Sequence, residues 1–382
     1  YGNKSLEINI QNKNPIDLIT PHPTREFPPN NKDIDFTSLY EVVKNKATPV
    51  SELTIGIAIN DKTRPVPYPK LIPPLIKELI NIGVQQNNIN FFIANGTHVP
   101  DHDLSNLSDD FTKKYNYIQH DCDKDLIYLG RSSLGTEIFI NQNYYRSDIK
   151  ISIGNVEPHH FAGYSGGAKT VAIGLAGKET ITHNHSLLID ENSVACEYHN
   201  NKVRQDIEEI GIRVGIDLSL NCIQTKDLQI IDLFFDSPHK VMRKAMPIID
   251  EINTVSIEKQ YDFLIASAGG FPKDINFYQA QKATSNASKI LKRNGVLFLL
   301  AECKEGPGSD SYFNYVRKFK SPADIIENFN LSKFTIGHHK AYLMAKTQMK
   351  NQVFLYSNMS ESIVKSLLIN PVINPTQFIN DY

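Results

Sequence analysis

The sequence is poor in cysteine, in long apolar runs and in blocks of like charge. Its four cysteines lie far apart, which excludes the paired CxxC knuckles of structural zinc sites and is typical of the reducing cytoplasm. No apolar run approaches the roughly 18–20 residues of a membrane span, so we expect no membrane association. The net charge is −2, with no basic block or acidic tail, which gives no reason to expect nucleic acid as a partner.

The length of the chain bears on the number of domains. Single hydrophobic cores rarely grow beyond about 250–300 residues, so a chain of 382 residues predicts two domains. Clear periodicity is lost over residues 246–255, which favours a boundary near 245–260. We therefore expect an N-terminal α/β domain over residues 1–250 and a C-terminal α/β domain over residues 251–382.

Apolar runs alternate with helical patterns in both parts of the chain. In the N-terminal part, strands are expected at residues 6–10, 53–59, 89–93, 149–153 and 228–235 (the last a strand or a buried turn), and helices at 69–82, 169–175 and 202–215. In the C-terminal part, strands are expected at 261–266, 295–300, 334–337 and 352–356, and a helix at 278–293. This alternation predicts α/β units on largely parallel sheets.

Polar or glycine-rich clusters follow directly after four of these strands, at residues 61–64, 95–98, 154–169 and 267–274. Ligands of open parallel sheets bind beyond the carboxyl ends of the strands. We therefore expect the four clusters to converge on one site, in a crevice between the two domains.

The richest cluster, residues 154–185, is dense in histidine, glycine and lysine. Within it, residues 163–170 come within one residue of a P-loop, but Ala168 stands where that loop needs glycine. Three local interpretations stay open: a nucleoside triphosphatase, a site for a single phosphate, and a tight turn with a solvent lysine. Four histidines are candidate metal ligands, although their spacing is not that of a zinc protease: His159, His160, His183 and His185.

Other candidates are groups for binding an anion or moving a proton. Arg64 offers a charged fork for a carboxylate, with Asp61 holding it or a nearby histidine; the alternative is a helix cap with a surface pair. His98 ends the next strand as a candidate general base. Tyr278 and Lys282 are spaced to share a helical face, either as a second cationic clamp or as a solvated surface.

Taken in order, six motifs resemble those of the lactate racemase (nickel-pincer) family. They are D-x-T-R-P at 61–65, G-T-H at 96–98, E-P-H-H-F-A-G-Y-S-G-G-x-K at 157–169, N-H-S at 184–186, G-G-x-P-K-D-x-N-x-Y-Q-x-x-K at 269–282 and E-C-x-E-G-x-G at 302–308. The resemblance implies a two-domain α/β protein with its site between the domains. It also implies a pyridinium-derived mononucleotide that carries nickel and is tethered to a lysine through a thioamide.

The resemblance also implies roles for individual residues. Lys169 would hold the cofactor beside Gly166 and Gly167, and His185 would bind nickel. His98 and His159 would be the two acid/base residues, one for each face of the substrate. The substrate carboxylate would be gripped by Arg64 and Lys282, with Tyr278 and Gln279 nearby and Asp61 in support.

The resulting expectation is a cytoplasmic racemase or epimerase of a 2-hydroxy acid, served by proteins that make and insert its cofactor. Hydride transfer to an electrophilic cofactor avoids the carbanion that direct proton removal would form. The alternatives are a non-catalytic anion-binding homologue and a P-loop-like NTPase. Ala168 and Val99 stand where family members often carry a basic residue, which favours a bulkier or more apolar 2-hydroxy acid, or a sugar acid, over lactate.

Overall fold

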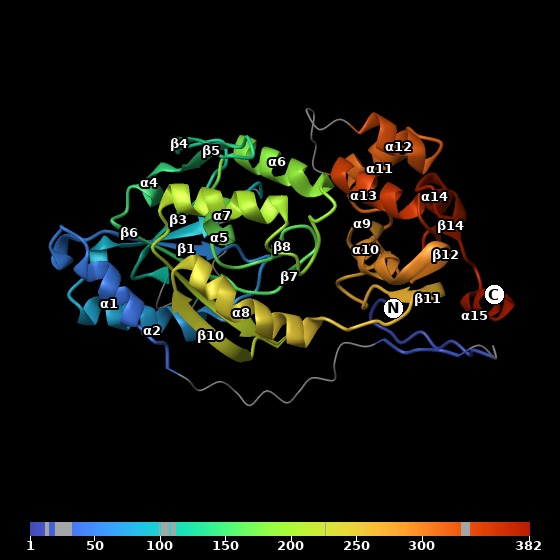
Figure 1. Ribbon diagram of the computed structural model, residues 1–382, viewed down its shortest axis with the longest axis horizontal. Helices are drawn as coiled ribbons and strands as arrows, with labels where there is room; N and C mark the ends of the chain where they lie inside the picture. Colours follow the sequence, from blue (N-terminus) through green and yellow to red (C-terminus); the bar gives the residue numbers. More distant parts are fainter. Residues whose placement is uncertain are drawn as a thin grey trace. The chain divides into compact units, whose positions relative to one another are not determined.

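The computed structural model describes residues 1–11, 15–19, 33–98, 100, 107, 112–225, 227–329 and 337–382 (Figure 1). The chain forms two compact units. The larger unit comprises Thr20–Thr254, and the smaller unit comprises Tyr1–Ile19 together with Val255–Tyr382. The first residues of the chain therefore belong with its C-terminal part.

The larger unit is built on a six-stranded sheet in the order β10-β9-β6-β1-β2-β3. Every neighbouring pair is parallel except β10 and β9. The strands are β1 (Ile55–Asn60), β2 (Ile89–Ala94), β3 (Asn116–Gln119), β6 (Ile149–Asn155), β9 (Leu218–Gln224) and β10 (Ile230–Asp236). Two antiparallel pairs stand apart from this sheet: β4 (Leu126–Arg131) with β5 (Glu137–Asn141), and β7 (Pro158–His159) with β8 (Gly163–Tyr164).

Helices cover both faces of this sheet. They are α1 (Thr37–Lys44), α2 (Tyr68–Asn81), α4 (Gln142–Tyr145), α5 (Lys169–Ala172), α6 (Lys178–Ser186), α7 (Lys202–Val214) and α8 (Pro238–Asn253). The apolar face of α2 packs on alternate residues of the central strands, and α4 and α5 pack on the other side, with α7 against α5 (Figure 1). Every residue of β1 is buried, as expected for a parallel strand covered on both faces.

The register of the central strands positions the site. Asn60 at the end of β1 is paired with Ala94 at the end of β2, and Ile59 is paired with Ile153 of β6. Because the three strands are parallel and in step, the segments that follow them leave the sheet at the same edge.

The smaller unit contains a parallel sheet in the order β11-β12-β13-β14. Its strands are β11 (Tyr261–Ser267), β12 (Leu291–Leu300), β13 (Gln352–Tyr356) and β14 (Asn370–Pro371). Its helices are α9 (Phe277–Ala280), α10 (Lys282–Ala287), α11 (Asp310–Val316), α12 (Pro322–Asn328), α13 (His338–Gln348), α14 (Glu361–Ser366) and α15 (Pro375–Asp381). Fold class and the largely parallel sheets were therefore predicted correctly from the alternation of strands and helices.

The loss of periodicity at 246–255 does not end a helix at its start: residues 246–253 continue α8, whose buried face runs from Val241 to Ile249 despite Pro247 inside the helix. Two local predictions were wrong. Residues 6–10 form no strand; the backbone of Asn9 and of Gln11 instead hydrogen-bonds to the side chain of Asn380. The predicted helix at 278–293 is divided into α9 and α10, and residues 291–293 already belong to β12. Most of the strand expected at 334–337 lies outside the described residues.

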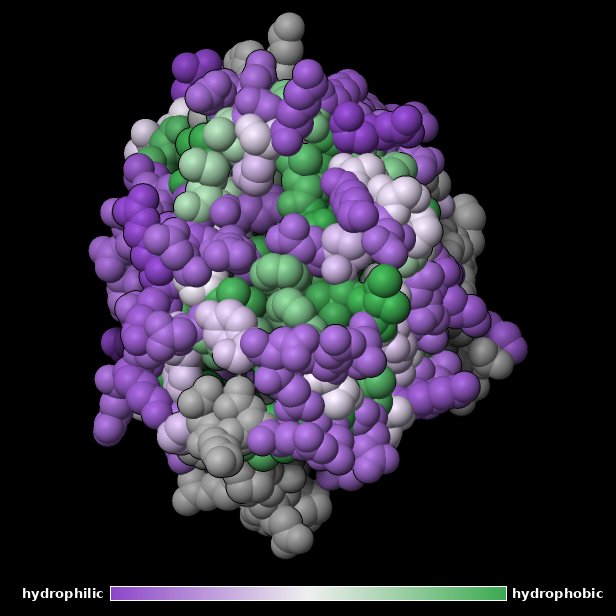
Figure 2. Space-filling view, turned by 90° about the vertical axis from the view of Figure 1, so that its right-hand side faces the viewer, coloured by the Kyte–Doolittle hydropathy of each residue, from purple (hydrophilic) through white to green (hydrophobic). Residues whose placement is uncertain are grey.

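The polarity of the surface and of the helices agrees with the amino-acid composition. Within the described ranges, no helix is both long and apolar enough to cross a membrane. The face shown in Figure 2 is mostly hydrophilic, with hydrophobic side chains exposed in limited areas between charged ones.

Candidate active site

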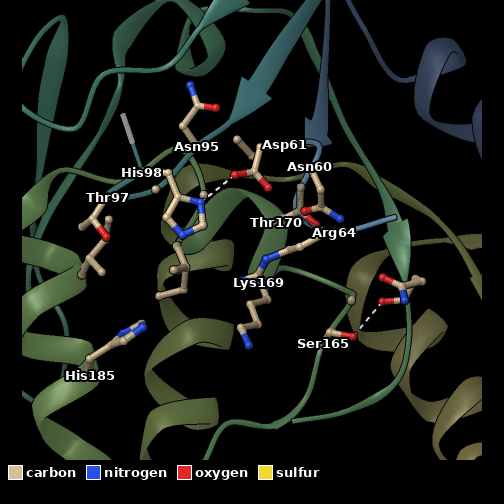
Figure 3. A pocket seen from close by; sticks show the side chains of 17 residues that line it. Asn60, Asp61, Arg64, Asn95, Thr97, His98, Ser165, Lys169, Thr170 and His185 are labelled. Atoms are coloured by element: carbon tan, nitrogen blue, oxygen red, sulfur yellow. Dashed lines mark hydrogen bonds and ion pairs between the residues drawn. The ribbon is translucent and has the colours of Figure 1, made fainter. Parts of the chain in front are cut away.

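A pocket opens at the carboxyl edge of the six-stranded sheet (Figure 3). It is lined by the ends of β1, β2 and β6, the turns after β1 and β2, the glycine loop (residues 163–168), α5 and α6. Six residues singled out in the sequence line it: Asp61, Arg64, His98, Gly166, Lys169 and His185. The predicted convergence of the clusters at 61–64, 95–98 and 154–169 is therefore confirmed, whereas the cluster at 267–274 belongs to the smaller unit.

Asp61 and His98 form an ion pair at the rim of the pocket. The Nδ1 of His98 lies 2.6 Å from Asp61 Oδ2, and the hydroxyl of Thr63 donates to Oδ1 at 2.7 Å. The hydrogen bond to Asp61 raises the pKa of His98, against the opposing effect of burial. Burial would raise the pKa of Asp61, but the bonds from His98 and Thr63 bring it below its ordinary value. Of the two partners that the sequence indicated for Asp61, Arg64 and a nearby histidine, the histidine is the one that donates a hydrogen bond to its carboxylate.

Lys169, the first residue of α5, is only 4% exposed, yet it lines the pocket. Its Nζ has no hydrogen-bond partner among the described residues. Burial lowers the pKa of Lys169 well below its ordinary value, and the positive charges of Arg64 and Arg204 lower it further. A lowered pKa favours the neutral form of the amine, which is the nucleophilic form of lysine.

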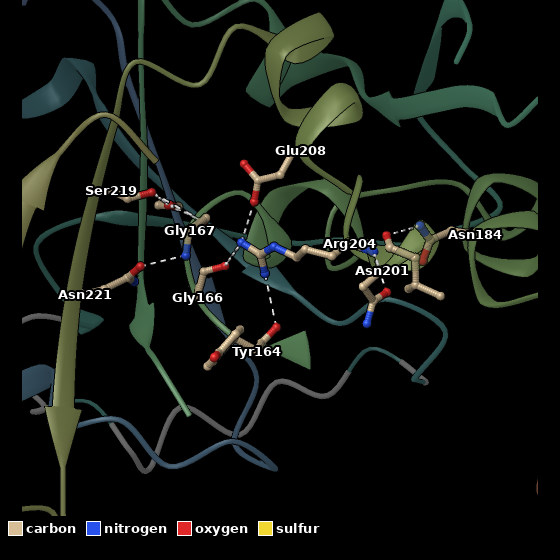
Figure 4. A network of polar contacts seen from close by, with 11 residues as sticks. Tyr164, Gly166, Gly167, Asn184, Asn201, Arg204, Glu208, Ser219 and Asn221 are labelled. Atoms are coloured by element: carbon tan, nitrogen blue, oxygen red, sulfur yellow. Dashed lines mark hydrogen bonds and ion pairs between the residues drawn. The ribbon is translucent and has the colours of Figure 1, made fainter. Parts of the chain in front are cut away.

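Side chains of α7 and β9 form hydrogen bonds with the backbone of the glycine loop (Figure 4). Arg204, which is fully buried, donates to the carbonyl oxygens of Tyr164 at 3.1 Å and Gly166 at 3.3 Å, and pairs with Glu208. The backbone N–H of Gly167 donates to Asn221 Oδ1 at 2.7 Å. A triphosphate cradle needs consecutive backbone N–H groups facing the ligand, so this arrangement disfavours the P-loop interpretation.

His159 and His185, the two other histidines to which the resemblance assigns a role, both pack against the ring of Phe161. Phe161 packs edge-on against His159, with centroids 4.7 Å apart, and against His185, with centroids 5.0 Å apart. The Nδ1 of His159 accepts the backbone N–H of Ala162 at 3.2 Å. Burial, with smaller effects from neighbouring basic side chains, lowers the pKa of His159 well below its ordinary value. The surroundings therefore raise the pKa of His98 and lower that of His159.

A buried polar network positions α6, the helix that carries His185. Asn184 donates to Asp206 Oδ2 at 2.8 Å, and Thr136 and Ser132 donate to the same carboxylate. The Nδ1 of His183 lies 2.7 Å from Thr136 Oγ1, so this candidate metal ligand is engaged away from the pocket lining. Sequence reasoning missed Asp206 and Arg204, since only the packing of α7 shows that these two charges are buried.

Val99 and Ala168 are the two positions at which the sequence departs from the family motifs. Val99 lies outside the described residues. Ala168 is 1% exposed and does not line the pocket. A Cβ placed on Gly211 of α7 would come within 2.5 Å of the methyl group of Ala168, so this methyl group faces α7.

Three predicted substrate ligands lie in the smaller unit. Tyr278 and Gln279 belong to α9, and Lys282 begins α10. The ring of Tyr278 packs against Tyr312 of α11, with centroids 5.7 Å apart. Tyr278 also contacts a lysine that the sequence did not single out: Lys340 of α13 lies 3.5 Å above the ring centroid.

Fold and site together define an α/β protein with a buried lysine and an Asp–His pair in one polar pocket. A model of the lactate racemase N-terminal domain matches residues 1–196, and one of the lactate racemase C-terminal domain matches residues 257–378. The chain belongs to the lactate racemase family.

Individual relatives are distant. A lactate racemase of Thermoanaerobacterium thermosaccharolyticum is 26% identical over 328 residues, which cover 83% of this chain and 76% of that protein. A lactate racemase of Lactiplantibacillus plantarum is 26% identical over 280 residues, covering 72% of this chain and 66% of that protein.

Two solved structures share the fold. The lactate racemase apoprotein of T. thermosaccharolyticum superposes with a TM-score of 0.79 at 24% identity, covering 88% of this chain and 84% of that one. A protein of Thermotoga maritima superposes with a TM-score of 0.61 at 14% identity, covering 87% of this chain and 90% of that one.

Proposed function

We propose that this chain is a racemase or epimerase of a 2-hydroxy acid that uses a nickel-pincer nucleotide tethered to Lys169. The observation that carries the proposal is the buried amine of Lys169, which has no hydrogen-bond partner among the described residues and shares a pocket with Arg64, the Asp61–His98 pair and His185. A protein that only binds anions has no use for a neutral nucleophile in such a place.

The residues present fit the cofactor that the family suggests. A neutral buried amine is suited to forming an amide-type bond with an acyl group of a cofactor. His185 lines the same pocket and provides an imidazole, which suits nickel. When bound, the cofactor would supply an electrophilic carbon that takes up the substrate's α-hydrogen as hydride and returns it. In this proposal, dedicated proteins make and insert the cofactor.

His98 is suited to accept the hydroxyl proton of the substrate. With Nδ1–H donated to Asp61, the neutral ring presents Nε2 as a base. The carboxylate of Asp61 then stabilises the imidazolium that forms, in the same way that it raises the pKa of His98.

His159 is the second acid/base residue of the proposal. Because its Nδ1 accepts an N–H, its neutral ring carries the proton on Nε2 and can donate it. Its lowered pKa favours that neutral form at pH 7. Inversion at one carbon needs a proton acceptor on one face of the substrate and a proton donor on the other, and each histidine of the proposal would exchange these two roles when the reaction runs in reverse.

The pocket itself provides one anion ligand of the proposal. Arg64 lines it, and its guanidinium offers two parallel donors to a carboxylate. Lys282, Tyr278 and Gln279 belong to the smaller unit, and their part in substrate binding is a proposal that comes from the family resemblance.

The test is to produce the chain together with a nickel-pincer biosynthesis pathway and to measure intact mass, nickel content and racemisation of a panel of 2-hydroxy acids. About one nickel per chain, an adduct mapping to Lys169 and loss of optical activity would support the proposal. An unmodified chain from a working pathway would overturn it and favour the anion-binding homologue. Lys169→Ala should lack the adduct, and Lys77→Ala, which replaces an exposed lysine on α2, should keep it as the matched control.

His98→Ala and His159→Ala test the two-base scheme separately from the tether. Each variant should keep the adduct and lose racemisation by at least about 100-fold in both directions, because general acid–base groups contribute roughly 10²–10⁴-fold. Near-normal racemisation in either variant would refute the scheme while leaving the attachment site in place.

A further inference from the structure

The proposed function gives no role to the E-C-x-E-G-x-G segment at residues 302–308. This segment follows β12 and lies against residues 274–278, which lead into α9. Four backbone bonds from N–H to carbonyl oxygen join the two segments: Cys303 to Asp274 (2.9 Å), Glu305 to Ile275 (2.8 Å), Phe277 to Gly306 (3.0 Å) and Tyr278 to Pro307 (3.0 Å). The start of α9 is therefore fixed to the segment 302–308 through its backbone, as far as Tyr278.

Gly308 brings this segment close to the side chain of Tyr278. Its φ is +91°, and a Cβ at this position would lie 2.8 Å from the Cβ of Tyr278 and 2.8 Å from Oδ1 of Asn276. Gly306 also has a positive φ, +69°, but a Cβ there would meet nothing within 4 Å. Both glycines suit a left-handed backbone, which other residues adopt at a cost, but only Gly308 is also required by a close neighbour.

Asp274 joins both segments to the first residues of the chain. It is 1% exposed, and its Oδ2 accepts the N–H of Gly2 at 2.7 Å and the N–H of Glu302 at 3.0 Å. The carbonyl of Gly2 in turn accepts the N–H of Phe271 at 2.9 Å. Hydrogen bonds to a carboxylate are roughly twice as strong as those between neutral groups. One buried side chain therefore holds together three parts of the smaller unit that are far apart in the sequence.

These contacts converge on a residue to which the family resemblance assigns substrate binding. We propose that the segment 302–308 positions Tyr278 for substrate binding, with Gly308 and Asp274 as positioning residues. The inference rests on the proposed function for the role of Tyr278 and extends it to residues that act only through Tyr278. A side chain that is already held in its binding position loses less conformational entropy when the substrate arrives, so the segment lowers KM.

The first experiment measures amide hydrogen exchange in the full chain without cofactor. In Gly308→Ala, peptides that cover residues 275–281 should exchange at least about tenfold faster than in the wild type, because the new Cβ displaces Tyr278 from its bond to Pro307. In Gly306→Ala, the matched control, the rates should stay within about threefold of the wild type, since that Cβ meets open space. Equal rates in the two variants would show that only backbone strain matters and would overturn the inference.

Two substitutions of Asp274 test the anchor by the same measurement. Asp274→Ala removes the acceptor for two N–H groups and should speed exchange over residues 275–281 about tenfold. Asp274→Asn keeps an oxygen that accepts both bonds, so its rates should stay within about threefold of the wild type. Asp274→Asn exchanging as fast as Asp274→Ala, while folded by circular dichroism, would contradict the anchoring role.

Kinetics of the cofactor-loaded enzyme test the step from position to binding. Gly308→Ala and Asp274→Ala should raise KM about three- to tenfold, the effect of one lost hydrogen bond, with kcat and attachment at Lys169 changed less than about twofold. Gly306→Ala and Asp274→Asn should keep KM within about twofold of the wild type. A loss of kcat with unchanged KM, or faster exchange with unchanged KM, would overturn the inference.

Failure of the inference and failure of the proposed function give different results. A wild type that carries no adduct and racemises none of the acids would overturn the proposed function, whereas the exchange rates would still show whether the segment 302–308 holds Tyr278. An active wild type whose exchange rates do not separate Gly308→Ala from Gly306→Ala would overturn the inference alone.

Discussion

Two buried basic side chains lie at the glycine loop of the larger unit, and their surroundings differ. Arg204 is fully buried, and the two terminal nitrogens of its guanidinium contact two loop carbonyls and Glu208 (Figure 4). Lys169 is almost as buried, and among the described residues its Nζ has no hydrogen-bond partner. Removing one partner of a buried ion pair leaves an uncompensated charge and destabilises the fold, whereas a buried amine without a partner shifts its pKa and gains reactivity. We therefore assign support of the loop to Arg204 and a role as nucleophile to Lys169.

The largest expected effect is in Lys169→Met, which should abolish cofactor attachment and racemisation without lowering stability at pH 7. Methionine fills a similar volume and carries no amine. The folded chain holds the Lys169 pKa below the ordinary 10.5, so the unfolded chain binds more protons. The wild type therefore gains stability as pH rises toward 10.5, by up to about 1.4 kcal/mol per pH unit, and the variant lacks this gain.

Urea unfolding of the wild type and Lys169→Met at pH 7 and pH 9.5 measures this difference. Lys77→Met, on the exposed face of α2, controls for the general effect of pH on lysines. A destabilisation of several kcal/mol at pH 7 in Lys169→Met would mean that this amine is paired and supports the fold, contrary to the comparison.

The next effect is in Arg204→Met, which should lower the free energy of unfolding by about 3–5 kcal/mol. Removing the guanidinium leaves Glu208 and the carbonyls of Tyr164 and Gly166 without their donor. Adding Glu208→Leu removes the uncompensated charge and should recover a substantial part of the loss. Denaturant titrations of both variants provide the measurement.

Arg213→Met is the matched control for Arg204→Met. Arg213 lies on the same helix and pairs with Glu209 at 3.2 Å, but it is 45% exposed. Exposed pairs contribute less than about 1 kcal/mol. Equal losses in the two arginine variants would show that burial does not distinguish them.

A smaller effect should come from Gly211→Ala, at about 1–3 kcal/mol of lost stability. The new Cβ would lie 2.5 Å from the methyl group of Ala168, which directly precedes Lys169. Either the loop or α7 must move. Ala168→Gly in the same chain removes the contact and should restore stability relative to Gly211→Ala alone. Failure of the second substitution to relieve the first would show that the loop and α7 are not in tight contact.

The sequence predicted the strands that build the site but not the side chains that support it. Apolar runs at β1, β2 and β6 were sufficient, because buried parallel strands are continuous hydrophobic segments and their carboxyl ends meet at one edge. The pocket residues after them followed from that geometry. Arg204 and Asp206 were not predictable, because charged residues on a helix normally face water, and only packing shows that these two do not.

Local signals also failed where a distant contact decides the structure. Pro247 and the polar residues near it obscured the last turns of α8, whose buried face depends on packing against β9 and β10. The hydrogen bond between Asp61 and His98 joins two turns 37 residues apart. The sequence could therefore indicate a histidine only as one of two possible partners of Asp61. The placement of Lys340 over Tyr278 joins residues 62 apart and had no local signal.

The smallest expected effect on stability is in Asp61→Asn, because His98 is 55% exposed and its pair with Asp61 is screened by water. The raised pKa of His98 stabilises the fold below pH 6.5, and this contribution is lost as pH rises through the folded pKa. The lowered pKa of Asp61 stabilises the fold above pH 3.8, and this contribution is lost as pH falls through the folded value. The pair therefore acts mainly between about pH 4 and 6.5, and there it should contribute less than about 1 kcal/mol.

Urea unfolding at pH 5.5 and pH 8 should show a small difference between wild type and Asp61→Asn at the lower pH and none at the higher one. The ring resonances of His98 should titrate at a lower pH in the variant, because the carboxylate that favours the imidazolium is gone. A large loss of stability with an unchanged His98 titration would mean that Asp61 supports the turn after β1 instead. The expected result would separate an exposed pair, which tunes a proton, from the buried pair of Arg204, which holds a loop.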